Sequence, residues 1–201
     1  MVEERRAEAL ARTASVLSRE GLAGVPANVL AKAMFQSVGG LYRAFGSKEA
    51  VARAVVTHLD ELLFEHLGLA AIPLNGAEDF RALLLGLWSA VLAFAATEAD
   101  LFAYAHLHWR HPDGRERTID PQSTRCAALL EALLAKGMAC GQLRTQPPAV
   151  ARALVWGVLV QLVKERAAGA PCDPEQTFDT VWRALAATEG RSSPPDPAVR
   201  Y

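Results

Sequence analysis

The sequence has few cysteines, and their spacing does not suit a cross-linked or metal-bound scaffold. There are three, Cys126, Cys140 and Cys172, and no CxxC pair. An odd number at these spacings argues against a disulfide framework or a structural zinc site and indicates a reducing compartment. We therefore expect a cytoplasmic protein in which Cys126 and Cys140 are small apolar core residues.

The sequence also lacks a long apolar run. The longest weakly charged stretch, from Ala82 to Thr97, has 16 residues, fewer than the roughly 20 that span a bilayer. The charged N-terminal segment has no apolar core of the kind that a signal peptide requires. We therefore expect neither a membrane segment nor export.

The chain has no strong excess of positive or negative charge, but its charged residues are unevenly distributed. The chain has 21 Lys and Arg against 22 Asp and Glu, a net charge of −1. Residues 1–48 hold seven Lys and Arg against four Glu, a net of +3, so the remaining 153 residues carry −4. A small basic module beside a larger acidic one is typical of a nucleic-acid-binding protein with a control domain.

Apolar residues are abundant, at 51% of the 201 residues, and recur at spacings of three and four without runs of alternating β-branched residues. This periodicity predicts an all-α fold. The predicted helices are Val2–Glu20, Pro26–Met34, Ser37–Phe45, Ser47–Leu67, Ala77–Thr97, Ala99–Trp109, Pro121–Ala139, Pro148–Ala168 and Pro174–Thr188. We expect the tail from Gly190, rich in Pro and Gly, to be disordered.

Residues 26–45 fit a helix-turn-helix, with a tight turn at Phe35 and Gln36. Ser37 and Ser47 are expected to cap the second helix of the motif and the long helix that follows. The spacing places an apolar face inward, made of Leu30, Ala31, Val38, Leu41 and Phe45. The opposite face carries Ser37, Gly39, Gly40, Tyr42 and Arg43.

This segment resembles the TetR family of transcriptional repressors over roughly residues 7–55. The matching positions are Leu30-Ala31-Lys32-Ala33, Ser37, Gly39, Leu41-Tyr42, Phe45 and Ser47-Lys48-Glu49. The resemblance implies an all-helical homodimer in which an N-terminal three-helix module binds DNA and the C-terminal helices hold a ligand pocket and the dimer interface. The domains expected are a DNA-binding domain at 1–48, a ligand-binding and dimerisation domain at 49–189, and the tail at 190–201.

The sequence departs from the family pattern around the turn. The family usually has Gly where Phe35 stands, and Thr or Ser where Val25 and Pro26 precede the first helix of the motif. A hydroxyl group that would bind phosphate is thereby missing. Lys or Arg is also common where this chain has Val38.

The predicted DNA-binding residues are Ser37, Val38, Gly39, Gly40, Tyr42, Arg43 and Lys48. Lys48 beside the free amides of a helix N-terminus suits a phosphate, and the Tyr42 hydroxyl can donate to another. Arg43 is expected to bind guanine or to contact only the backbone. The two glycines cost about 1 kcal/mol each in helix propensity, which indicates a close approach to DNA. The alternatives are a core role for Tyr42, a solvated Lys48 and a glycine loop.

The C-terminal section supplies bulky and mildly polar side chains for an apolar effector site in a helical bundle. The predicted ligand-binding residues are Trp88, Phe94, Phe102, Tyr104, His106, Trp109, Met138 and Trp156. The alternative is that these residues simply fill the core. His106, His108 and His111 are not expected to bind a metal, because residues two apart on a helix point about 200° apart.

Two apolar stripes in the last predicted helices exceed what a small domain buries alone. They contain Leu154, Val155, Val158, Leu159, Leu162, Phe178, Val181, Trp182 and Leu185. Two such helices from each chain can form a four-helix interface, so we predict a homodimer through about 148–168 and 174–188.

The function that follows is a repressor that binds a palindromic DNA operator and is released by a small, mostly apolar effector. No catalytic residue set, metal-ligand cluster or cofactor motif is present in the sequence, so an enzyme is not expected. The alternative is a TetR-like module that has lost specific DNA binding and binds proteins, which Phe35, Val38 and the missing hydroxyl favour.

Overall fold

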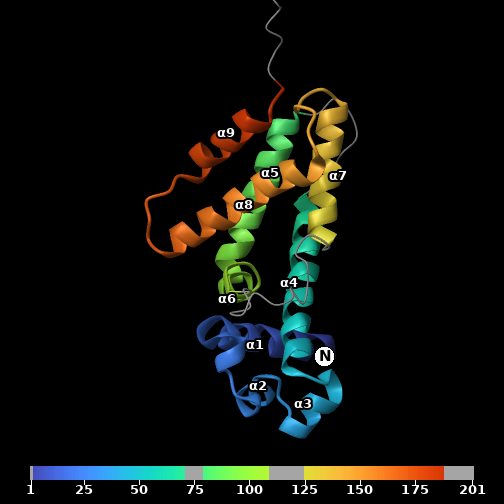
Figure 1. Ribbon diagram of the computed structural model, residues 1–201, viewed down its shortest axis with the longest axis vertical. Helices are drawn as coiled ribbons and strands as arrows, with labels where there is room; N and C mark the ends of the chain where they lie inside the picture. Colours follow the sequence, from blue (N-terminus) through green and yellow to red (C-terminus); the bar gives the residue numbers. More distant parts are fainter. Residues whose placement is uncertain (1, 71–78, 109–124, 188–201) are drawn as a thin grey trace, which may run out of the picture.

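The computed structural model describes residues 2–70, 79–108 and 125–187, and in these ranges the protein consists of helices joined by turns and short connections (Figure 1). The helices are α1 (Val2–Gly24), α2 (Ala27–Ala33), α3 (Val38–Phe45), α4 (Lys48–Ala70), α5 (Phe80–Thr97), α6 (Ala99–Ala103), the π-helical turn η1 (Tyr104–His108), α7 (Arg125–Ala139), α8 (Pro148–Ala167) and α9 (Pro174–Leu185). One isolated antiparallel bridge joins Leu143 and Ala186, and no strand is present in the described ranges. The predicted all-α class is confirmed.

An N-terminal module forms one end of an elongated molecule, with α1 lying across α2 and α3 (Figure 1). The stripe predicted on the first helix packs inward, since Leu10, Ala14 and Leu17 are buried. The predicted stop at Gly21 is confirmed, because the regular helix is interrupted at this residue. Gly21 has a φ of 68°, which kinks the helix, and helical structure then resumes as far as Gly24.

Helix α4 runs from this module into the rest of the molecule, where α5, α7, α8 and α9 form a bundle (Figure 1). The predicted domain boundary at residue 48 is the first residue of α4. Asp60, midway along α4, accepts hydrogen bonds from the backbone amides of Arg125 and Cys126 at 3.0 and 3.3 Å. A carboxylate at these free amides stabilises the start of α7 and ties it to α4.

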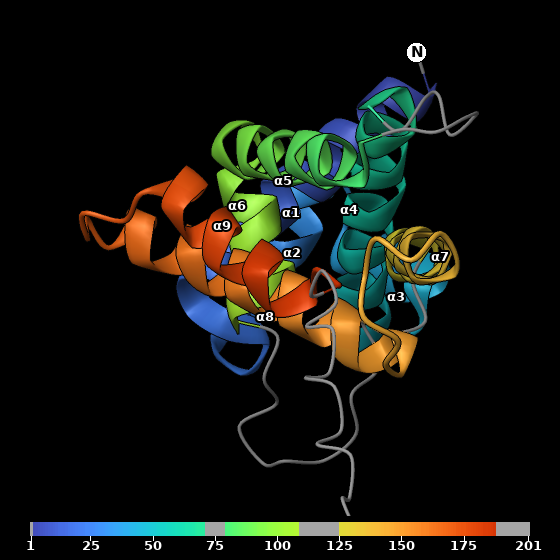
Figure 2. The ribbon, with the colours of Figure 1, turned by 90° about the horizontal axis from the view of Figure 1, so that it is seen from above.

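Helix α5 is the most apolar element, and by length and composition alone it could cross a membrane. It packs instead against α4, α8 and α9, and its core-facing side chains include Leu84, Trp88 and Val91. An ion pair between Arg81 and Asp179 further joins α5 to α9. These contacts are those of a core helix. Seen from above, α7 and α9 lie on opposite sides of the bundle, and α8 runs across it from beside α7 toward α9 (Figure 2).

Several predicted helix limits need correction. The helix predicted to run from Ala99 to Trp109 is α-helical only to Ala103 and continues as η1. Apolar spacings of three and four fit both forms, so the periodicity did not separate them. Asp79 caps α5 through the amides of Arg81 and Ala82. Parts of three predicted helices (77–78, 109 and 121–124) and the end of the last (188), together with the tail, lie outside the described residues.

Candidate nucleic-acid interface and apolar pocket

Helix α3 starts at a serine cap and presents most of its surface to solvent. The Gly40 amide donates to the Ser37 hydroxyl at 3.1 Å, as expected for an N-cap. Ser37, Gly39, Tyr42 and Arg43 are exposed, and Tyr42 keeps 42% of its surface accessible. Most of the face predicted to bind DNA is therefore accessible to a partner.

The inner face of the motif is partly as predicted. Leu30, Ala31 and Leu41 are buried and Phe45 is half-buried. Val38 does not belong to this face, because it is 39% exposed. It is the first residue of α3, and the turn after α2 rotates that position outward beside Tyr42, one helical turn further on.

Lys48 lies at the start of α4, where Ser47 accepts a hydrogen bond from the Ala50 amide at 3.1 Å. Its ammonium group donates to the Val25 carbonyl oxygen, so it holds the residue before α2 against α4. An ammonium has three donors, which leaves two for other acceptors. The pKa of Glu49 in the same turn is lowered by hydrogen bonds from its own backbone amide and the Ser47 hydroxyl.

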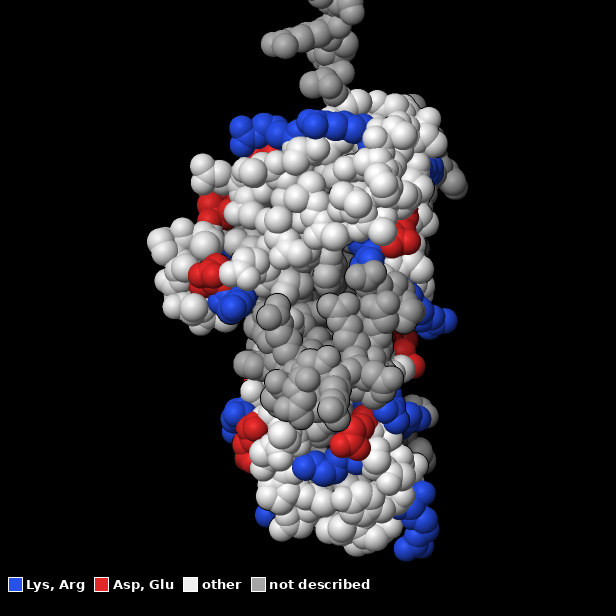
Figure 3. Space-filling view, viewed as in Figure 1, with Lys and Arg blue, Asp and Glu red and all other residues white. Residues whose placement is uncertain are grey.

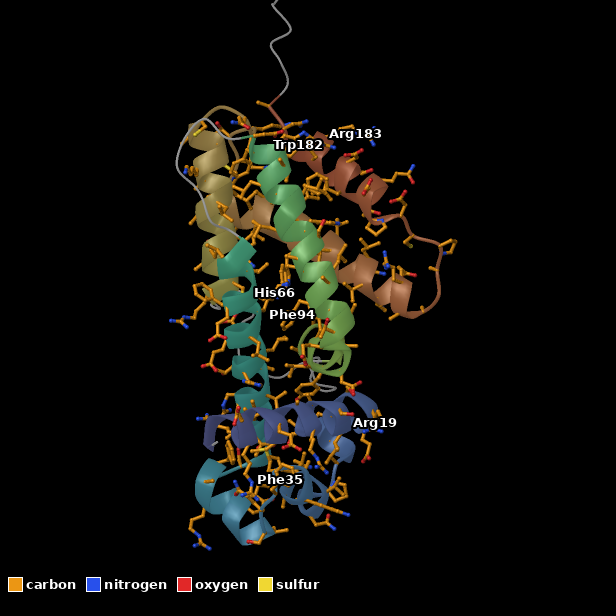
Figure 4. All side chains as sticks on the ribbon, turned by 180° about the vertical axis from the view of Figure 1, so that it is seen from behind. Arg19, Phe35, His66, Phe94, Trp182 and Arg183 are labelled. Atoms are coloured by element: carbon orange, nitrogen blue, oxygen red, sulfur yellow. The ribbon has the colours of Figure 1, made fainter. Side chains whose placement is uncertain are left out.

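Phe35 occupies the turn between α2 and α3 with a φ of 54°, a left-handed conformation that costs energy for any residue except glycine. Its ring is 41% exposed and lies below α1 (Figure 4). The guanidinium carbons of Arg12 and Arg5 lie 4.6 and 5.9 Å from the ring centroid, within the range of cation–π attraction.

The electrostatics of the motif favour an anionic partner. Residues 21–48 contain Lys32, Arg43 and Lys48 and no Asp or Glu. In the space-filling view, the end of the molecule formed by the α2–α3 region shows blue side chains and no red ones (Figure 3). Anions of a DNA backbone would meet no repelling carboxylate on this segment.

A narrow apolar pocket lies in the bundle between α4, α5, α7 and α8, and its cavity volume is about 30 Å³. Its lining is Leu67, Leu84, Leu87, Trp88, Val91, Cys126, Leu129, Leu130, Leu133, Val155, Trp156 and Leu159. Burial raises the pKa of the Cys126 thiol, with the Asp60 carboxylate acting in the same direction. None of the lining residues carries a charge, so the pocket suits an apolar, uncharged group.

His106 connects this pocket to the N-terminal side of the molecule. Its ring lies 5.3 Å from that of Trp156, which lines the pocket, and 4.5 Å from that of Phe102. The Nε2 atom is buried without a hydrogen-bond partner, and burial lowers the pKa of His106 to about 4, an effect that Asp60 partly opposes. His106 is therefore neutral at physiological pH.

The other predicted ligand-binding residues lie apart from the pocket lining. Phe94 packs against His66 across α4 and α5, with ring centroids 5.6 Å apart (Figure 4). Tyr104 is buried in η1, where desolvation raises its pKa, and Met138 is half-buried near the end of α7. Trp109 lies outside the described residues. Of the eight, the structure brings Trp88 and Trp156 to the pocket, with His106 and Phe102 behind Trp156.

A second, polar hollow lies between α1 and α4, lined by Arg6, Thr57, His58 and Glu61 among others. Burial lowers the pKa of His58, while the Glu61 carboxylate acts in the opposite direction. This hollow sits at the joint between the module and α4. Among the described residues, no group of three or more metal-ligating side chains is placed to hold a metal ion.

The arrangement of helices is shared with solved structures. A TetR family transcription regulator from Shewanella sp. PV-4 superposes with a TM-score of 0.74 at 18% identity, over 91% of this chain and 99% of that one. A regulator of the same family from Marinobacter aquaeolei VT8 gives 0.70 at 20% identity, over 94% and 100%. The chain has the TetR fold. No protein-family model and no curated protein matches it by sequence.

A third TetR-like structure shows what this fold can carry. AibR was solved with isovaleryl coenzyme A and operator DNA, and it superposes with a TM-score of 0.63 at 18% identity, over 90% of this chain and 98% of its own. In the present chain, TetR-like topology puts α3 on the outer surface of the module and the apolar pocket among α4, α5, α7 and α8.

Sequence reasoning missed most of the pocket and the links between helices. The leucines of the pocket lining carry no signal that distinguishes them from ordinary core residues. Asp60 caps a helix that starts 65 residues later, and Arg152, 7% exposed, is paired with Glu131 at 2.7 Å. The bulky side chains of the C-terminal section and the TetR resemblance both predicted a pocket in this part of the chain, but of the pocket lining they identified only Trp88 and Trp156.

Proposed function

We propose that this protein is a ligand-responsive transcriptional repressor that binds a palindromic DNA operator as a homodimer. The observation that carries the proposal is the outer face of α3, where Tyr42 and Arg43 are exposed in a segment without carboxylates. A helix of this kind fits the major groove, where side chains reach base edges while cations and helix termini bind phosphates. The AibR complex supports operator binding by the same fold.

DNA binding is tested by footprinting genomic fragments and then titrating the bound site at several salt concentrations. Arg43→Ala should relax the preference at one base pair per half-site if Arg43 reads guanine. Lys48→Ala should weaken binding to all sequences alike and lower the salt slope by about 1 per lost phosphate contact. Lys136→Ala, at an exposed position of α7 outside both the module and the proposed interface, is the matched control and should change neither.

The homodimer would use the outer face of α8 together with α9. Of the predicted interface residues, six are already buried within the chain: Val155, Leu159, Leu162, Phe178, Val181 and Leu185. The remaining surface is made of Leu154, Val158 and Trp182, which are half-buried, and Val150, which is 55% exposed. Val150, Leu154 and Val158 lie four residues apart and share one helix face.

Assembly is tested on that outer face. Val158→Arg should place an unpaired charge in the interface and give monomers by light scattering. Leu159→Arg is unsuitable, because Leu159 lines the apolar pocket and a charge there would disrupt the core. Ala135→Arg, at an exposed position of α7 outside the proposed interface, serves as a control for added charge. A wild-type protein that is monomeric at micromolar concentration would contradict the proposed dimer.

The effector would be small, mostly apolar and uncharged, and would bind in the pocket beside Trp88 and Trp156. It can shift DNA affinity only by binding one arrangement of the module more tightly than the other. The rings of Trp156, His106 and Phe102, which meet edge-on and tilted, provide a route, because α6 and η1 pack directly on α1. Tryptophan fluorescence detects such ligands, and a tight ligand that leaves operator affinity unchanged would contradict the gating.

A second candidate function is a protein-interaction module that no longer binds specific DNA. The exposed apolar side chains of Phe35, Val38 and Tyr42 favour it, as does the engagement of Lys48 with the Val25 carbonyl. The footprinting experiment separates the two functions: this candidate predicts no protected site, and only weak binding that does not depend on sequence.

A further inference from the structure

The first turn of α3 has almost no side chain that can hydrogen-bond to a base. Val38, Gly39 and Gly40 follow the cap, and the Ser37 hydroxyl already accepts a bond from the Gly40 amide. Arginine, lysine, asparagine and glutamine are the residues that read guanine and adenine by paired hydrogen bonds. None of them stands in this turn.

The surface of this turn is apolar and unusually open. Val38 is 39% exposed. A Cβ atom placed on Gly39 would have no other atom within 4 Å, so nothing from this chain covers the backbone there. Val38 and Tyr42 lie four residues apart and therefore form one exposed stripe along α3.

An apolar side chain in the major groove distinguishes one feature of a base pair, the 5-methyl group of thymine. Both glycines allow the start of α3 to approach the base edges closely enough for that contact. Lys32, Arg43 and the absence of carboxylates from residues 21–48 favour DNA over an apolar protein partner as the occupant of the stripe.

We infer that Val38 reads a thymine in each operator half-site through contact with its 5-methyl group. Val38 is then a specificity-determining residue, and the polar readout lies one turn further along α3, at Tyr42 and Arg43. This inference rests on the proposed DNA-binding function and adds the chemical class of base that the first turn of α3 selects.

The experiment replaces each thymine of the footprinted operator, one at a time, with deoxyuridine, which removes only the methyl group. Affinity of the full-length protein is measured by fluorescence anisotropy. One position per half-site should weaken binding about fourfold, the effect of burying a single methyl group, and substitution in both half-sites should multiply to about fifteenfold. At the same position, 5-methylcytosine should bind better than cytosine by a similar factor.

Two variants assign the effect to Val38. Val38→Thr keeps one methyl group and should retain sensitivity to deoxyuridine, whereas Val38→Ser has the same hydroxyl without the methyl and should lose it. Because the position is on the surface, both variants should keep the wild-type helical circular dichroism and melting temperature.

The outcomes separate this inference from the function on which it rests. Specific binding without any position sensitive to deoxyuridine, or sensitivity that survives in Val38→Ser, overturns the role of Val38 and leaves the repressor function standing. Absence of any specific site overturns both, and favours the apolar stripe as a protein-binding surface.

Discussion

The N-terminal module and the C-terminal bundle use their side chains in opposite ways. In the module, the candidate functional residues Val38, Tyr42 and Arg43 are exposed and take no part in the core. In the bundle, Trp88 lines the pocket among leucines that also build the core. Function and folding are therefore separable in the module, whereas a substitution in the pocket changes both.

Two glycines, one in the module and one in the bundle, differ in the same way. Gly39 in α3 has open space where a side chain would project, and Gly137 in α7 has none. A Cβ atom on Gly137 would lie 2.8 Å from Leu143 Cδ1 and 2.8 Å from Phe80 Cε1. One glycine keeps a surface free for a partner, and the other lets α7 pack closely against α5 and the residues that follow α7.

The largest expected effect is a loss of stability in acid that originates in the bundle. Burial lowers the pKa of His106 from 6.5 to about 4. Between these pH values, the unfolded chain binds a proton that the folded chain does not, so the free energy of unfolding falls as the pH falls. The loss reaches up to about 3 kcal/mol below pH 4. Urea denaturation across this pH range measures it.

His106→Phe removes the titrating group and keeps a ring beside Trp156 and Phe102. The variant should lose less stability than the wild type between pH 6.5 and 4. His58, whose pKa burial also lowers, and the carboxylates remain in both proteins and cancel in the comparison. Parallel pH profiles for the two proteins would show that folding does not lower the pKa of His106.

The difference between module and bundle also explains which parts of the structure can be predicted from the sequence. Serine caps, glycine stops and apolar spacing are local signals, and they predicted the helices and the α2–α3 motif, including the caps at Ser37 and Ser47. Contacts between distant residues have no local signal. The Asp60 cap on α7 and the Trp156–His106 contact therefore could not be predicted. The sequence wrongly predicts that Val38 faces inward, because its apolar side chain at this spacing resembles that of a core residue.

The second effect tests close packing in the bundle. Gly137→Ala should lower the free energy of unfolding by about 1–3 kcal/mol, because the added methyl group overlaps Phe80 and Leu143. Gly86→Ala is the matched control, since Gly86 is exposed in α5 with no atom within 4 Å of a new Cβ, and it should raise stability by up to about 1 kcal/mol. Equal stabilities would show that the bundle adjusts without cost.

The third prediction is a substitution that should increase stability and decrease operator affinity. Gly39→Ala should raise the free energy of unfolding by up to about 1 kcal/mol, because alanine is the better helix former and nothing obstructs it. Operator affinity should fall several-fold, because the methyl group projects from the surface that approaches DNA. Thermal unfolding and anisotropy on the same samples measure both. Unchanged operator affinity would place the DNA elsewhere on α3.

The smallest effect concerns the backbone of the turn between α2 and α3. Phe35→Gly and Phe35→Ala both remove the ring that lies under Arg12 and Arg5, so both lose the same cation–π attraction. They differ in the cost of a φ of 54°, which is low for glycine and about 1 kcal/mol for alanine. Phe35→Gly should therefore be the more stable variant by about 1 kcal/mol in urea denaturation. If alanine is equally well tolerated, the turn relaxes out of the left-handed region once the ring is gone, and the contacts of Phe35 with α1 are what hold it there.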